Sequence, residues 1–193
     1  NTILDVGKIF NELGFNLISY DLRTFGDNKA TTNTYGMFEK DDLLDVMDYY
    51  GEDTYILYGQ SYGAMPTILN INDERVSKVI LDSPVTDGSE MIKNTLVVMD
   101  KDNAEFMYEA GNFYTKLTYS WSFEDIDLYD DLKNINKPIL ILYSENDKVI
   151  NPEQVNRLKN FENIKLYNTN GKHAEYYREN EEDFIKVIED YLN

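Results

Sequence analysis

The chain has 193 residues, which suits one domain that buries about 70% of its unfolded surface. Its formal net charge is −18, which argues against nucleic acids and anionic membrane surfaces as partners. There is no cysteine, so disulfides, thiolate metal sites and a cysteine nucleophile are excluded.

The first part of the chain alternates helical and strand patterns. Residues 2–13 carry apolar side chains at helical spacing, and FNLISY at residues 15–20 predicts a buried strand followed by a polar loop. Residues 40–50 predict a helix closed by Gly51. The apolar run at residues 54–58 predicts the next strand.

The middle of the chain contains a region of different character. KVIL at residues 78–81 predicts a strand. Residues 85–127 then carry many aromatic side chains and no clean strand pattern, so we expect a helical insertion there. ILILY at residues 139–143 is a continuous apolar run, as is typical of a strand buried on both faces of a parallel sheet.

The last part returns to alternation. We expect a short helix over residues 152–159, a strand over residues 164–167 and a terminal helix over residues 174–192 that is imperfect near Asn180. Strands that alternate with helices throughout a chain indicate an α/β fold with a mostly parallel sheet and flanking helices. We therefore predict a single α/β domain over residues 1–193.

The pentapeptide GQSYG at residues 59–63 joins the predicted strand 54–58 to a segment that can be helical. A serine between glycines at such a turn is the setting of a nucleophile elbow, which exposes the hydroxyl of Ser61 and aims a helix N-terminus at it. We expect a side chain at either flanking glycine to clash. The alternative interpretation is a turn serine that caps a helix.

Other chemistry-bearing residues also follow predicted strands, where ligands bind in open α/β sheets. His173 is the only histidine, so it is the one imidazole that can act as base for Ser61. Asp147 is a candidate for the carboxylate that orients the imidazole, with Glu145 and Asp82 as rivals. The alternatives are a solvated loop histidine and a turn aspartate.

These motifs resemble the α/β-hydrolase family over nearly the whole chain. The matching pieces are the elbow, Asp82-Ser83-Pro84, the strand that leads to Asp147, and Gly171-Lys172-His173, in the order serine, acid, histidine. The resemblance implies that Ser61 is the nucleophile, Asp147 the orienting acid and His173 the base. It also implies that Asp82 is an alternative acid and that residues 85–127 form a cap over the site.

The chain departs from the family at its start. The resemblance implies that the backbone N–H of Tyr62 is one oxyanion donor, whereas the loop that carries the second donor and the first three strands are missing. A partial α/β-hydrolase sheet would then have a gap. Either residues 15–20 pair directly with residues 54–58, or both leave open edges that favour self-association.

The segment Asp21-Leu22-Arg23-Thr24-Phe25-Gly26-Asp27 resembles a D-x-R-G-x-G-x-S loop that is common in the family. Thr24 and Asp27 depart from that pattern. We expect Asp21 and Arg23 to organise the loop rather than to take part in catalysis.

We predict hydrolysis of an ester, thioester or amide through a Ser61 acyl-enzyme, impaired in the chain as given. The substrate would be a small acyl compound, and no metal or organic cofactor is implied because no cluster has ligand spacing. The alternatives are an acyltransferase of the same fold and a non-catalytic binding protein. A haloalkane-type enzyme would need aspartate in place of Ser61.

No apolar run is long enough to cross a membrane, and no secretory signal is visible. We therefore expect a cytoplasmic protein. The chain begins at Asn1 rather than at methionine, so this expectation leaves open a targeting segment before it.

Overall fold

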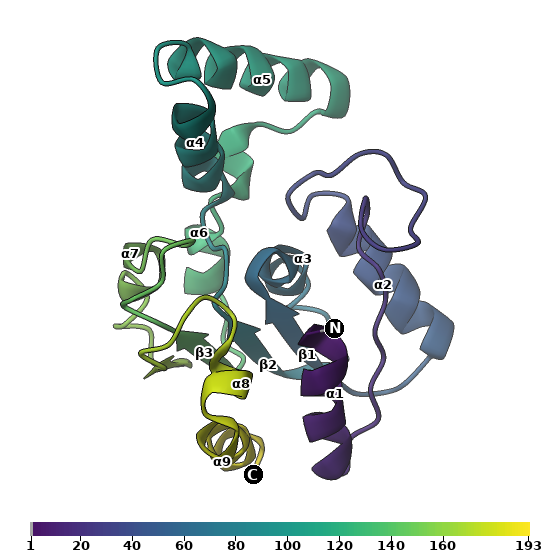
Figure 1. Cartoon of the computed structure of the whole chain (residues 1–193). Coiled ribbons are helices and arrows are strands. Elements are labelled where there is room, and N and C mark those ends of the chain that lie inside the picture. The colour runs from purple at the N-terminus through teal and green to yellow at the C-terminus, as the bar shows by residue number, and fades with distance from the viewer. Residues whose placement is uncertain (1) are drawn as a thin grey trace.

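Four parallel strands form the centre of the computed structural model, which describes residues 2–193 except for the side chains of residues 2 and 3. The strands are β1 (Tyr55–Gln60), β2 (Val76–Asp82), β3 (Ile139–Tyr143) and β4 (Ile164–Asn168), and they lie side by side in that order. Figure 1 shows helices on both sides of this sheet. The predicted α/β class, a partial α/β-hydrolase sheet with flanking helices, is confirmed.

The helices connect the strands and cover the two faces. In chain order they are α1 (Thr2–Glu12), α2 (Glu39–Tyr50), η1 (Ser61–Gly63), α3 (Ala64–Leu69), α4 (Gly88–Met99), α5 (Ala104–Tyr119), η2 (Phe123–Ile126), α6 (Tyr129–Lys133), α7 (Glu153–Asn156), α8 (Tyr176–Glu179) and α9 (Glu181–Leu192). Within residues 2–193, none of them is long and apolar enough to cross a membrane.

The apolar strands bury side chains on both faces, because successive residues point to opposite sides. Ile80 lies opposite Leu140, and both belong to the core formed with α1, α8 and α9. The next pair, Leu81 and Ile141, belongs to the core formed with α2, α3 and α6. The sheet is therefore sandwiched between two hydrophobic cores, as its continuous apolar sequence predicts.

Most element bounds follow the sequence pattern. Strand β3 has the predicted limits, and α2 ends at Tyr50, directly before Gly51, whose φ of 67° is the left-handed conformation that favours glycine at a helix end. The expected irregularity of the terminal helix separates α8 from α9 at Asn180, where φ is −152°. The helix predicted over residues 152–159 is shorter, because only α7 is regular there.

The strand predicted over residues 15–20 is wrong. These residues form no regular secondary structure, and they do not pair with β1, which lies at the edge of the sheet beside β2 alone. Leu17 is 38% exposed, so the segment is not buried either. A strand needs a neighbouring strand that takes its backbone hydrogen bonds, and no strand of the described residues pairs with this segment.

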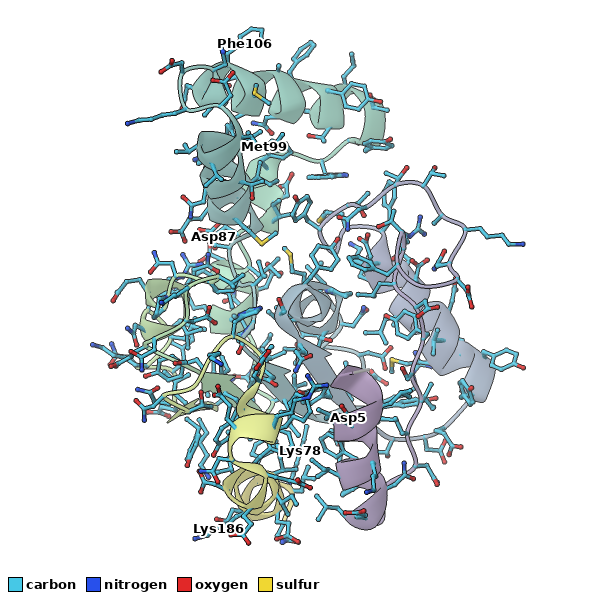
Figure 2. The ribbon with its side chains drawn as sticks, viewed as in Figure 1. Asp5, Lys78, Asp87, Met99, Phe106 and Lys186 are labelled. Carbon is cyan, nitrogen blue, oxygen red and sulfur yellow. The ribbon has the colours of Figure 1, made fainter. Side chains whose placement is uncertain are left out.

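The region after β2 carries α4 and α5, which rise away from the sheet in Figure 1. Gln154 holds the segment that leads into α4, because the Gln154 side chain accepts hydrogen bonds from the backbone N–H groups of Thr86 and Asp87 at 3.2 and 3.0 Å. Figure 2 shows Asp87 at the foot of α4 and Phe106 on the outer side of α5, where Phe106 is 75% exposed. The role of this region as a cap stays a prediction.

Candidate active site

Ser61 lies directly after β1, at the first position of the turn η1. Its φ of 51° is in the left-handed region, which residues other than glycine adopt only when the surroundings enforce it. One enforcing contact is the N–H of Val85, which donates to the carbonyl of Ser61 at 3.2 Å. The strand end and the turn together fix where the hydroxyl points.

The two glycines of the elbow differ in the space around them. A Cβ at Gly59 would lie 2.6 Å from Thr67 Oγ1 and 2.8 Å from Ala64 Cα, so a side chain is excluded there. A Cβ at Gly63 would meet only Leu22 Cδ1 at 3.9 Å, an ordinary contact, and φ of Gly63 is −64°. The prediction that both flanking positions reject a side chain is therefore wrong for Gly63, because the space beside Gly63 is open.

Ser61, His173 and Asp147 form a chain of hydrogen bonds. The Oγ atom of Ser61 lies 2.8 Å from Nε2 of His173, and Nδ1 of the same ring lies 2.8 Å from Oδ2 of Asp147. An ionised carboxylate only accepts, so Nδ1 carries the proton and Nε2 accepts from the serine hydroxyl. This tautomer leaves Nε2 free to take the proton of Ser61.

The carboxylate of Asp147 is held by its own loop. Its side chain is 4% exposed, and Oδ1 accepts from the N–H groups of Val149 and Ile150 at 2.8 and 3.0 Å. Oδ2 is thereby directed at His173. The rival acid Glu145 is exposed, and it is Asp147 that contacts the imidazole.

Asp82, the other rival acid, is buried at the end of β2 with 1% of its surface exposed. It accepts hydrogen bonds from Tyr58, Gln60 and Ser83 rather than from His173. Burial raises the pKa of Asp82, and the hydrogen bonds from Gln60, Tyr58 and Ser83 oppose that rise.

Tyr62 follows Ser61, and its phenol is anchored by the loop that contains Asn33 and Tyr35. Its hydroxyl donates to Asn33 Oδ1 at 2.6 Å and accepts from the N–H of Tyr35 at 2.8 Å. Burial raises the pKa of this phenol. The backbone N–H of Tyr62 lies in the turn η1, and the first N–H groups of a helical turn have no partner within it.

A buried glutamate organises the loop that holds Tyr62. Glu39 is fully buried and accepts from the N–H and hydroxyl of Thr34 and from the N–H of Gly36. Its side chain also lies 3.4 Å from the hydroxyl of Tyr62. The sequence does not predict these contacts of Asn33 and Glu39, because nothing in their local pattern distinguishes them from ordinary loop and helix residues.

The loop of residues 21–27 is tied to α2. Arg23 binds Asp42 through two nitrogen–oxygen contacts of 2.5 and 2.7 Å. Asp21 accepts from the N–H of Asp27 at 2.8 Å within the same loop. The ion pair of Arg23 and the hydrogen bond of Asp21 both hold the loop in place, in line with the expectation that Asp21 and Arg23 organise it.

Among residues 2–193, no group of three or more histidine, cysteine or acidic side chains is placed to hold a metal ion. The side chains that the strand ends bring together are those of Ser61, His173 and Asp147.

Comparison with known proteins agrees with this geometry. The model of the alpha/beta hydrolase fold family matches residues 6–113, a stretch that contains the elbow. The uncharacterized protein YqkD of Bacillus subtilis is 25% identical over 196 aligned positions, which cover 96% of this chain and 64% of that protein. The lysophosphatidylserine lipase ABHD12 of Macaca fascicularis is 26% identical over 171 positions, which cover 80% of this chain and 39% of the lipase.

A similar solved structure is that of the esterase Pf2001 of Pyrococcus furiosus. It superposes with a TM-score of 0.74 at 19% identity and covers 97% of this chain and 74% of the esterase. This likeness shows a shared fold. The chain spans less than two thirds of the length of the two curated relatives, 64% and 39%.

Proposed function

The chain belongs to the alpha/beta hydrolase fold family, and on that premise we propose that it is a serine hydrolase of acyl compounds. The observation that carries the proposal is the hydrogen-bonded chain from Ser61 through His173 to Asp147, with two contacts of 2.8 Å. A serine hydroxyl is a weak nucleophile until a neighbouring base removes its proton. His173 is placed for that task and Asp147 fixes its tautomer.

In the first half of the reaction, Ser61 Oγ attacks the carbonyl carbon of an ester, thioester or amide. The hydroxyl proton passes to Nε2 of His173, and the imidazolium that forms is stabilised by Asp147. The carbonyl oxygen becomes an oxyanion that accepts from the backbone N–H of Tyr62. The bond to the leaving group then breaks, and Nε2 returns the proton to the departing atom, which leaves an acyl-enzyme on Ser61.

In the second half, water attacks the acyl carbon. His173 takes one proton from this water and returns it to Ser61 Oγ as the ester bond to the enzyme breaks. The free acid leaves and the serine is restored. If an alcohol or an amine attacked the acyl carbon in place of water, the same residues would catalyse acyl transfer. An assay should therefore measure release of the free acid.

We expect slow turnover from residues 1–193 by themselves. Tyr62 supplies the one oxyanion donor identified among the described residues, and removal of one donor typically costs about 10²–10³ in kcat. Acyl esters are the substrate class to test first, because the relatives include a protein named as a lipase and a structure named as an esterase.

The test is release of free acid from p-nitrophenyl esters of short and long acyl chains. Ser61→Ala and His173→Ala should each abolish turnover above the background. Ser77→Ala is the matched control, because Ser77 is an exposed serine at the opposite end of the sheet, where its hydroxyl donates to the carbonyl of Tyr55. Equal turnover in all four proteins would contradict the proposal.

A further inference from the structure

Side chains from two strand ends hold the backbone of Ala174, the residue after the imidazole. Its N–H donates to Ser83 Oγ at 2.9 Å, and its carbonyl accepts from Gln60 Nε2 at 3.4 Å. We call Gln60 and Ser83 the Ala174 clamp. Ala174 has a φ of 54°, a left-handed conformation that is strained for a residue with a Cβ. Relaxation of that strain would turn the adjoining His173.

Both side chains of the Ala174 clamp converge on Asp82. The hydroxyl of Ser83 donates to Oδ1 of Asp82 at 3.2 Å, and the amide of Gln60 donates to Oδ2 at 2.9 Å. The hydroxyl of Tyr58 donates to the same Oδ2 at 2.8 Å. Asp82 is fully enclosed by these partners, so losing an acceptor there would leave a buried donor unsatisfied.

The direction of these bonds requires a carboxylate at position 82. The oxygen of Ser83 accepts from Ala174, so its single proton is free for Asp82. The amide nitrogen of Gln60 donates to Asp82 at 2.9 Å, and it lies 3.4 Å from the carbonyl of Ala174 and 3.4 Å from the hydroxyl of Tyr58. An asparagine at position 82 would turn an amide toward one of these donors, because only one of its two polar atoms accepts.

We propose that Asp82 is a positioning residue for His173, acting through the Ala174 clamp. Its carboxylate fixes both clamp side chains, the clamp fixes the strained backbone of Ala174, and that backbone keeps the imidazole in reach of Ser61. The other side of the loop is held separately, because Ser144 Oγ donates to the carbonyl of Gly171 at 2.7 Å. The catalytic consequence rests on the proposed function, whereas the placement of the imidazole does not.

The central variant is Asp82→Asn, which keeps the size of the side chain and removes one accepting oxygen. Asp73→Asn is the matched control, because Asp73 is a hydrogen-bonded carboxylate that precedes the same strand at the opposite end of the sheet. Ser83→Ala and Gln60→Ala each remove one half of the clamp. If Asp82→Asn does not fold, these two variants test whether the Ala174 clamp positions His173.

The direct readout is the NMR signal of the imidazole, since His173 is the only histidine of the chain. With ¹⁵N-labelled histidine, wild type and Asp73→Asn should give one set of signals and a slowly exchanging Nδ1 proton. In Asp82→Asn and in the clamp variants we expect this proton to exchange about tenfold faster or more, because a loosened contact opens more often. A loss of stability alone, as in Asp73→Asn, would not produce this change.

The second readout is ester hydrolysis. We expect kcat to fall about 10- to 100-fold with KM within about twofold, because a displacement near 1 Å of a catalytic group costs up to about 10²-fold. Unchanged histidine signals together with unchanged kcat in folded variants would overturn the role of Asp82. If wild type hydrolyses no ester, the proposed function fails, and the histidine spectra still decide whether Asp82 places the imidazole.

Discussion

Two segments of similar length, both predicted from the sequence to be strands, differ in their secondary structure. ILILY at residues 139–143 forms β3 with a parallel neighbour on each side, and four of its five residues are buried. FNLISY at residues 15–20 remains without regular secondary structure and is partly exposed. Both runs carry β-branched or aromatic residues that favour extended backbone, although FNLISY also contains Asn16 and Ser19.

The difference lies in what surrounds each run. β3 donates and accepts hydrogen bonds along both edges and packs against helices on both faces. Residues 15–20 follow α1 and pair with no strand of the described chain, and β1 keeps one edge of the sheet without a strand partner. A strand therefore forms only where a second strand takes its backbone hydrogen bonds. Its own sequence shows only that the segment can adopt an extended conformation.

Hydrogen exchange should show the largest contrast between the two runs. Amides of β3 open only with the whole molecule, whereas most amides of residues 15–20 lack a backbone partner, so we expect protection to differ by about 10³-fold or more. Exchange followed by mass spectrometry measures both segments in one experiment. Comparable protection of the two would mean that residues 15–20 pair after all.

Truncation of one leucine in each run should sharpen the comparison. Leu140 is fully buried in β3, so Leu140→Ala should lower the free energy of unfolding by about 2–5 kcal/mol. Leu17 is 38% exposed, so Leu17→Ala should cost about 1 kcal/mol or less. Urea unfolding of both variants tests this, and equal losses would contradict the difference in burial.

The same dependence on neighbours separates the two glycines of the elbow. Gly59→Ala should destabilise the protein by about 1–3 kcal/mol, because its Cβ would overlap atoms of α3. Gly63→Ala should change stability by less than about 1 kcal/mol in either direction, since the site is open and φ is negative. Thermal unfolding of the pair provides the measurement, and a larger loss for Gly63→Ala would refute the account.

The smallest expected effect is a loss of stability at acid pH from Asp73, which lies at the end of the sheet remote from Ser61. Hydrogen bonds from Arg75 lower the pKa of Asp73 from 3.8 to about 2. A carboxyl with a depressed folded-state pKa stabilises the protein above the unfolded pKa and loses that contribution as the pH falls. The stability difference between wild type and Asp73→Asn should therefore shrink between about pH 4 and pH 2, as followed by urea titration. A constant difference would exclude this link.

The sequence predicted those parts of the fold and site that depend on nearby residues. The strands of the sheet, the turn at Gly51 and the break at Asn180 follow from local patterns. The positions of Ser61, Asp147 and His173 at strand ends follow from motif order. Their roles stay predictions until activity is measured.

The remaining features depend on contacts between distant residues. Gln60 and Ala174 are 114 positions apart, so no local pattern links the elbow to the backbone beside His173. The strand prediction for residues 15–20 is wrong for the same reason, because the sequence of a segment does not show whether another strand pairs with it. The space beside Gly63 likewise depends on Leu22, which lies in another loop.

In the proposed function, the imidazole of His173 makes the hydroxyl of Ser61 reactive. A fluorophosphonate probe tests it most directly, with the modified peptide located by mass spectrometry. We expect the adduct on Ser61 in wild type, none in Ser61→Ala, and labelling slower by about 10²-fold or more in His173→Ala. Labelling of His173→Ala at the wild-type rate, or an adduct on another residue that persists in Ser61→Ala, would contradict the claim.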